Sequence, residues 1–152
     1  MNQIETLAWN FRKAIDAANK LGKFKMDIVY KNFPYGCCGD TSDLLAEYLL
    51  ENGVKTFYVC GTYIDEEFEK MQSHAWLCTD GEIIVDITGD QFKYDSTFLN
   101  YNNPVYVGKM DEFHKLFIID ERDIHECYGL SQVGDFNYCR LKNIYDLIKK
   151  ML

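Results

Sequence analysis

Residues 36–53 read GCCGDTSDLLAEYLLENG, and this stretch decides how the chain is expected to fold. Apolar side chains recur every three or four residues in its second half, which predicts a helix over residues 41–52. The apolar stripe consists of Leu44, Leu45, Tyr48 and Leu49. Gly53 follows at the position where a left-handed residue commonly ends a helix. Cys37 and Cys38 stand just before the predicted start, so the stretch combines a buried helix face with two thiols at its amino end.

The segments on either side of this helix predict an α+β fold. Residues 2–22 carry apolar side chains at the same spacing and end in Gly22, which predicts an amino-terminal helix. Strand patterns follow the central helix at residues 55–62, 73–79 and 82–88. Weaker patterns suggest strands at 105–107 and 116–119 and a closing helix at 140–151. Helices followed by consecutive strands favour N-terminal helices packed on an antiparallel sheet.

Length and charge limit the classes of protein that fit. The 152 residues suit a single domain spanning 1–152, because a chain of this size buries a sufficient core without metal or disulfide staples. The net charge of −8 repels phosphate backbones and anionic lipids, so we expect neither nucleic acid nor a membrane as a partner. No apolar run approaches the roughly 20 residues that span a bilayer.

The six cysteines favour a reduced, cytoplasmic protein, or an effector delivered from the cytoplasm. Their density is below that of secreted domains stapled by disulfides. The starting residues MNQIE also lack the basic and apolar regions of a secretory signal. Neither Cys-x-x-Cys nor His-Glu-x-x-His occurs, and no Asp-x-Asp-x-Asp-Gly run is present. We therefore expect no zinc site, no calcium loop and no cofactor.

The two cysteines before the central helix are candidate nucleophiles. The first turn of a helix has unpaired N–H groups and a partial positive charge, which favour a thiolate over a thiol. The alternative is that Cys37 and Cys38 are small buried apolar residues, as most free cysteines are.

A cysteine nucleophile needs a base, and three histidines are available. His114 and His125 lie in polar surroundings without a clear pattern, so we expect both at the surface. His74 alternates with Trp76 and Cys78 on one face of the second predicted strand. A histidine on such a face can be either a hydrogen-bonded core residue or a catalyst.

The register of the hairpin after His74 decides whether Asp86 can orient that histidine. A two-residue Asp80-Gly81 loop pairs residues whose numbers sum to 161 and puts Asp86 on the opposite face. A three-residue loop of residues 79–81 makes the sum 160, sets His74 directly opposite Asp86 and makes Gly81 left-handed. We predict the second register, with a His74–Asp86 hydrogen bond of about 2.6–3.2 Å. The alternative leaves Asp86 facing solvent.

Three blocks of sequence resemble the core of the transglutaminase-like superfamily. They are Gly36-x-Cys38-x-Asp40-x-Ser42 with the helix that follows, His74-Ala75-Trp76, and Asp86-Ile87-Thr88. The match covers residues 36–88, with the blocks in the family's order. Counting from Cys38 places Ser42 and Gly53 on the family's small-residue and glycine positions, whereas counting from Cys37 breaks both. Serine replaces the usual alanine at 42, and twelve residues between histidine and aspartate is a short spacing.

The resemblance implies a papain-like fold with Cys38, His74 and Asp86 as a catalytic triad. It implies an acyl-transfer enzyme that forms a thioester, in the first instance a cysteine peptidase or amidase acting on a protein or peptide. A transglutaminase or deamidase with the same triad and an inert papain-fold binding module are the alternatives. Gln91 and Phe92 could line the site, and an oxyanion hole would use the Cys38 N–H with a second donor near Asn32 or Tyr35.

Overall fold

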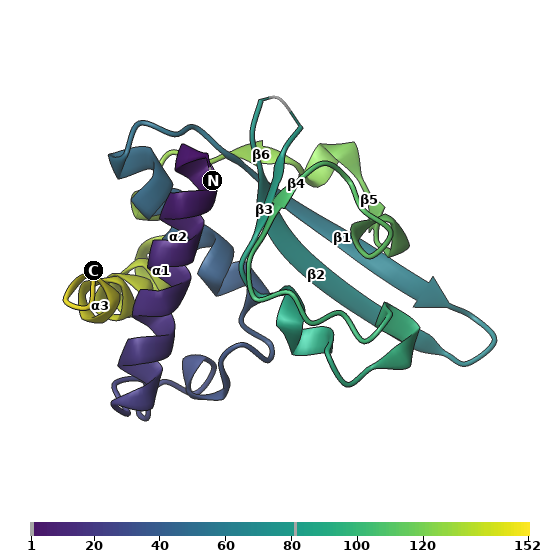
Figure 1. Ribbon diagram of the computed structural model, residues 1–152, viewed down its shortest axis with the longest axis horizontal. Helices are drawn as coiled ribbons and strands as arrows, with labels where there is room; N and C mark the ends of the chain where they lie inside the picture. Colours follow the sequence, from purple (N-terminus) through teal and green to yellow (C-terminus); the bar gives the residue numbers. More distant parts are fainter. Residues whose placement is uncertain (1, 81) are drawn as a thin grey trace.

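Helices gather at one end of the molecule and an antiparallel sheet extends from the other (Figure 1). The computed structural model describes residues 2–80 and 82–152. Within these residues it has three α-helices and six strands, which confirms the α+β class. None of the described helices is both long enough and apolar enough to cross a membrane.

The helices are α1 (Gln3–Lys20), α2 (Cys38–Glu51) and α3 (Asp135–Lys149). Helix α1 starts where the Asn2 side chain accepts a hydrogen bond from the Glu5 N–H at 2.8 Å, a typical N-cap. Helix α2 begins three residues earlier than the periodicity predicts, because the apolar stripe marks only the part of a helix that is packed. Helix α3 likewise starts five residues before the predicted closing helix.

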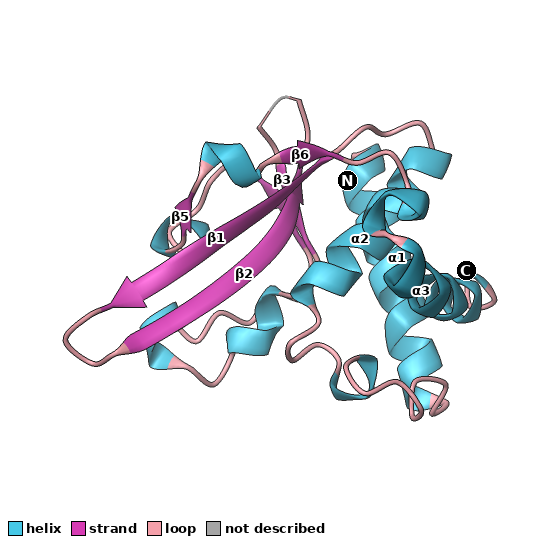
Figure 2. Ribbon diagram, turned by 180° about the vertical axis from the view of Figure 1, so that it is seen from behind, coloured by secondary structure: helices cyan, strands magenta, loops and turns pink. Residues whose placement is uncertain are grey.

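The strands are β1 (Phe57–Asp65), β2 (Lys70–Cys78), β3 (Ile84–Asp86), β4 (Tyr106–Gly108), β5 (Ile118–Ile119) and β6 (His125–Glu126). The sheet has the order β4-β3-β2-β1-β5, and β6 also pairs with β1. Its longest part is the β1–β2 hairpin, which pairs all nine residues of each strand and projects away from the helices (Figure 2).

The β2–β3 register differs from both predicted registers. Leu77 pairs with Val85 and Cys78 with Ile84, so paired residue numbers sum to 162. The predicted connection at residues 79–81 is wrong, because the Thr79 N–H still donates to the Ile83 carbonyl at 2.9 Å. A left-handed residue in this connection is Glu82, at φ 60°; the predicted conformation of Gly81 lies outside the described residues.

Although the register is shifted, it keeps His74 and Asp86 on the same face of the sheet. Side chains alternate between the two faces, so a shift of two residues preserves the face whereas a shift of one reverses it. Asp86 is therefore not directly opposite His74 but offset from it along the strand. The carboxylate is nevertheless buried, so the alternative of a solvent-facing Asp86 is excluded.

The two faces of the sheet pack against different parts of the chain. Alternate residues Leu77, Val85 and Ile87 join the core formed with the three helices. The opposite face carries a mainly aromatic core made by Val59, Trp76, Ile84, Phe92, Phe98, Phe113 and Phe117. Residues 89–119 supply four of these side chains, so the segment after β3 covers the face that holds His74 and Asp86.

Candidate active site

The start of α2 presents Cys38 to β2. The backbone of Ala75 in β2 is one of the groups that lower the pKa of Cys38, so the sulfur lies close to this strand. The imidazole of His74 lowers the pKa of Cys38 and Cys38 raises that of His74, so the ring and the sulfur are neighbours. Cys38 is partly exposed, so the thiol combines contact with a histidine and access from outside.

The two adjacent cysteines have opposite environments. Cys37 is fully buried, and its thiol donates to the carbonyls of Val29 and Tyr35 at 3.5 and 3.4 Å. Burial and the nearby carboxylate of Asp40 raise the pKa of Cys37 to about 12. Burial opposes ionisation of Cys38 as well, but its hydrogen bond to His74 and the charge of that ring lower the pKa of Cys38 below its ordinary value. The structure therefore makes Cys38 the more readily ionised of the pair.

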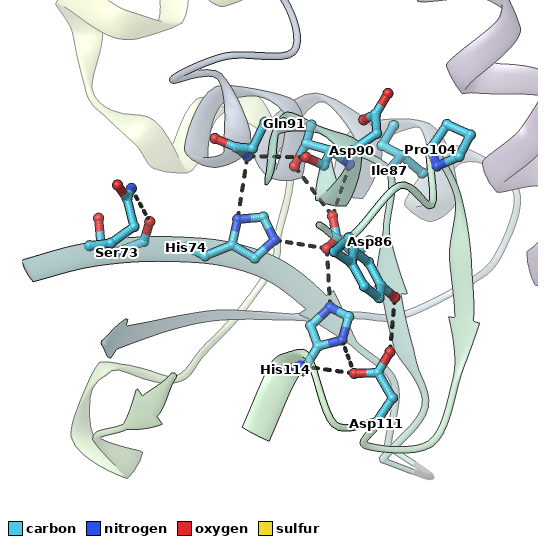
Figure 3. A network of polar contacts seen from close by, with 12 residues as sticks. Ser73, His74, Asp86, Ile87, Asp90, Gln91, Pro104, Asp111 and His114 are labelled. Atoms are coloured by element: carbon cyan, nitrogen blue, oxygen red, sulfur yellow. Dashed lines mark hydrogen bonds and ion pairs between the residues drawn. The ribbon is translucent and has the colours of Figure 1, made fainter. Parts of the chain in front are cut away.

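His74 is held by Asp86 through one of its two ring nitrogens. His74 Nε2 lies 2.8 Å from Asp86 Oδ2, which confirms the predicted hydrogen bond (Figure 3). Burial disfavours the charged ring, but the charge and hydrogen bond of Asp86 outweigh it and raise the pKa of His74 to about 9. The ring is thus stabilised as an imidazolium next to Cys38.

Asp86 remains ionised although it is almost completely buried. Burial would raise its pKa, but the charge of His74 and the hydrogen bond from His114 hold the pKa of Asp86 well below its usual range. The Thr88 N–H and hydroxyl donate to Asp86 Oδ1 at 2.9 and 3.3 Å. Because both oxygens accept hydrogen bonds, the carboxylate is fixed in orientation.

The segment after β3 brings Gln91 and Phe92 to the same histidine. Gln91 Nε2 lies 3.4 Å from His74 Nδ1 and donates to the Thr88 carbonyl at 3.1 Å. The Phe92 ring meets His74 edge to face, with ring centroids 5.1 Å apart. This amide therefore lies at the ring nitrogen of His74 that Asp86 does not bond.

Trp76, the next residue on the His74 face of β2, and the two expected oxyanion donors have different positions. Trp76 is buried beside His74, with ring centroids 5.6 Å apart, so it belongs to the core behind the site. The described hydrogen bonds of Asn32 and Tyr35 all lie within residues 29–37, and none reaches Cys38. The prediction of a second oxyanion donor at these two positions therefore has no support in the geometry.

His114 also belongs to the candidate site, although the sequence predicts a surface position for it. The expectation of a surface position is wrong, because His114 is completely buried; His125 is exposed as expected. His114 Nε2 lies 3.1 Å from Asp86 Oδ2, the oxygen that also bonds His74. The signal that could have indicated burial is the pair of phenylalanines at 113 and 117, which flank His114 and belong to the aromatic core.

Two histidines and a carboxylate at one point also raise the question of a metal ion. One ligand atom each from His74, Asp86 and His114 lies within 4.8 Å of the others. The nitrogen–oxygen distances of 2.8 and 3.1 Å are those of hydrogen bonds. Zinc at about 2.0–2.1 Å from each atom would hold tetrahedral ligands further apart than this. The arrangement therefore fits shared protons better than a shared cation.

Comparison of the chain with protein-family models, with curated proteins and with solved structures finds no match in any of the three.

Proposed function

We propose that this protein is a cysteine acyl-transfer enzyme of the transglutaminase-like, papain-like type, which hydrolyses an amide bond in a protein or peptide. The observation that carries the proposal is the contact of Cys38 with His74, whose Nε2 bonds the buried Asp86 at 2.8 Å. A partly exposed thiol with a lowered pKa, a base beside it and a fixed orienting carboxylate are the three parts that thiol catalysis requires.

The proposed reaction begins with attack of the Cys38 thiolate on the substrate carbonyl carbon. The His74 imidazolium then gives its proton to the leaving amine as the carbon–nitrogen bond breaks, which leaves a thioester on Cys38. Neutral His74 next takes a proton from water, the resulting hydroxide attacks the thioester, and the thiolate is released. Asp86 holds the ring and stabilises its charged form in both halves of the cycle.

The oxyanion formed during each attack needs N–H donors close to the thiol. Cys38 is the first residue of α2, and the N–H groups of the first turn of a helix have no partner within the helix. Gln91 offers a second donor, because its amide lies 3.4 Å from the nitrogen of His74 that Asp86 does not bond. In this proposal Gln91 replaces the donor that we expected near Asn32 or Tyr35.

An activated ester tests the proposal without knowledge of the natural substrate. With p-nitrophenyl acetate we expect a burst of nitrophenolate equal to the enzyme concentration, and intact-mass and peptide analysis should find one acetyl group on Cys38. Cys38→Ala should abolish the burst, whereas the matched variant Cys37→Ala should keep it. Acetylation of another residue, or a burst that survives in Cys38→Ala, would refute the proposal.

Added primary amines then separate hydrolysis from acyl transfer. A hydrolase releases acetate at a rate that small amines hardly change. A transferase would pass the acetyl group to the amine and turn over faster as the amine concentration rises. Incorporation of amine as the main product would replace the proposed hydrolysis by transfer through the same thioester.

A further inference from the structure

A chain of polar groups, buried at Asp86 and His114 and partly exposed at Asp111 and Tyr101, continues behind the candidate active site. His114 Nε2 lies 3.1 Å from Asp86 Oδ2, and His114 Nδ1 lies 2.6 Å from Asp111 Oδ1 (Figure 3). The Tyr101 hydroxyl donates to Asp111 Oδ2 at 2.9 Å. Hydrogen bonds therefore run without interruption from His74 through two carboxylates and a second imidazole to Tyr101.

The positions of the two carboxylates determine where the protons of His114 must lie. A neutral imidazole has one N–H donor and one acceptor nitrogen, whereas an ionised carboxylate can only accept. Both nitrogens of His114 face a carboxylate oxygen, so a neutral ring would direct a lone pair at one of them. His114 is completely buried, so solvent water does not reach the ring to relieve that contact.

The remaining contacts show that both carboxylates act as acceptors. Asp111 Oδ1 also accepts from the His114 backbone N–H at 2.8 Å, and its other oxygen accepts from Tyr101. Asp86 Oδ1 accepts from Thr88. Because Asp86 and Asp111 both accept hydrogen bonds, a proton on each ring nitrogen of His114 gives every hydrogen bond in this chain one donor and one acceptor.

We propose that His114 is a positioning residue: held as an imidazolium between Asp86 and Asp111, it reduces the affinity of His74 for its proton. The inference rests on the proposed function, because it concerns the base of that reaction. His74 and His114 bond the same oxygen of Asp86 and their ring centroids are 6.2 Å apart. Two positively charged rings that bond one carboxylate oxygen repel each other, and the negative charge of the carboxylate stabilises each of them less than it would stabilise one alone.

A positively charged His114 beside Asp86 would suit the proposed role of His74, which must accept a proton in one step and donate it in another. Asp86 alone, in a buried site, would bind the His74 proton strongly and slow its transfer to a leaving amine. The titratable groups that face His74 are Cys38, Asp86 and His114, and the uncharged amide of Gln91 lies 3.4 Å from its Nδ1. Those that face His114 are Asp86, Asp111, Tyr101 and Tyr106, the last with ring centroids 5.3 Å apart. Among these groups, His114 is the one that opposes the charge on His74.

Nitrogen NMR of protein carrying isotope-labelled histidine tests the proposal directly. At neutral pH we expect two ring N–H groups on His114, assigned by the loss of its signals in His114→Gln. In His114→Gln the midpoint of the His74 titration should rise by about one pH unit, because the neighbouring positive charge is gone. In Asp111→Asn, which keeps the shape of the side chain, His114 should retain a single ring N–H. His125→Gln is the matched control, since this exposed ring bonds neither Asp86 nor Asp111 in the described contacts.

Several results would overturn the inference. A single ring N–H on His114 in the unmodified protein would do so without any variant, even if His114→Gln failed to fold. An unchanged His74 midpoint in folded His114→Gln would show that the second histidine only fills space, and two N–H groups in Asp111→Asn would remove Asp111 from the argument. A stoichiometric metal ion whose removal by a chelator changes these spectra would replace the shared protons by coordination. Failure of the proposed function would appear separately, as absence of Cys38 acylation in the unmodified protein.

Discussion

Treatment with one equivalent of iodoacetamide at pH 6 should alkylate Cys38 well ahead of the buried Cys37. The pKa of Cys37 is raised to about 12, whereas that of Cys38 is lowered from 9.0, so their values differ by more than about three units. The thiolate fraction of Cys38 therefore exceeds that of Cys37 by more than about a thousandfold. A less basic thiolate is also a weaker nucleophile, which reduces this advantage by about 25-fold over three units. A preference of at least about fortyfold remains, before the difference in exposure is counted.

The other cysteines provide the controls for this experiment. Burial raises the pKa of Cys60, Cys78 and Cys127, which protects them at pH 6. Cys139 is exposed, so the assay is repeated in Cys139→Ser to remove competition by access alone. The label is located by digestion and mass spectrometry, and His74→Ala should abolish the preference. Equal labelling of Cys37 and Cys38, or a preference that survives in His74→Ala, would refute the reasoning.

Three further predictions concern stability. Asp86→Asn should lower the free energy of unfolding by about 3–5 kcal/mol at neutral pH, because it breaks a buried charge pair. Because the pKa of Asp86 is lowered from its ordinary value of 3.8, its ionisation stabilises the folded protein above that pH, and this stability is lost as pH falls toward the folded-state pKa. In urea titrations, the difference in free energy of unfolding between the unmodified protein and Asp86→Asn should therefore become smaller in acid. A difference that does not change with pH would contradict this prediction. Arg12→Met should cost about 3–5 kcal/mol, since it leaves Asp90 buried without the guanidinium that bonds it at 2.8 and 2.9 Å; a loss below about 1 kcal/mol would show that the pair contributes little. Gly61→Ala places a Cβ 2.7 Å from the Phe117 Cβ and should destabilise by about 1–3 kcal/mol, which an unchanged thermal melt would disprove.

The elements of the fold could be predicted wherever a local pattern is strong. Helix α1 and strands β1 and β2 lie close to their expected places, because period and propensity act over a few residues, but both strands extend three residues further toward their connection than predicted. Element ends were less accurate. The start of α2 carries little apolar periodicity, since Cys38, Gly39 and Asp40 precede the packed stripe, and the sequence pattern consequently placed the helix start three residues too late.

The contact between His74 and Asp86 was predicted, although the register behind it was wrong. Side chains alternate between the two faces of a sheet. A register shift by an even number of residues therefore leaves each side chain on the same face, whereas an odd shift reverses it. The alternation of side chains indicated that His74 and Asp86 share a face of the sheet. The contact between them was indicated because a buried carboxylate needs a partner. Which residue ends the hairpin was decided by the pairing of Thr79 with Ile83, which no local preference revealed.

Sequence patterns are sufficient to predict the α+β class, the two thiols at a helix start and the strand that carries His74, because these features depend on neighbours in the chain. Which of the two thiols is accessible depends on tertiary packing, since the burial of Cys37 comes from a loop packed around it. Only the tertiary structure brought His114 to Asp86, across 28 residues that lack a shared pattern. Burial and charge pairing depend on contacts between residues that are distant in the sequence. A hydrophobic pattern with a period of two or 3.6 residues indicates the face on which a residue lies, but it does not indicate which distant residue packs there.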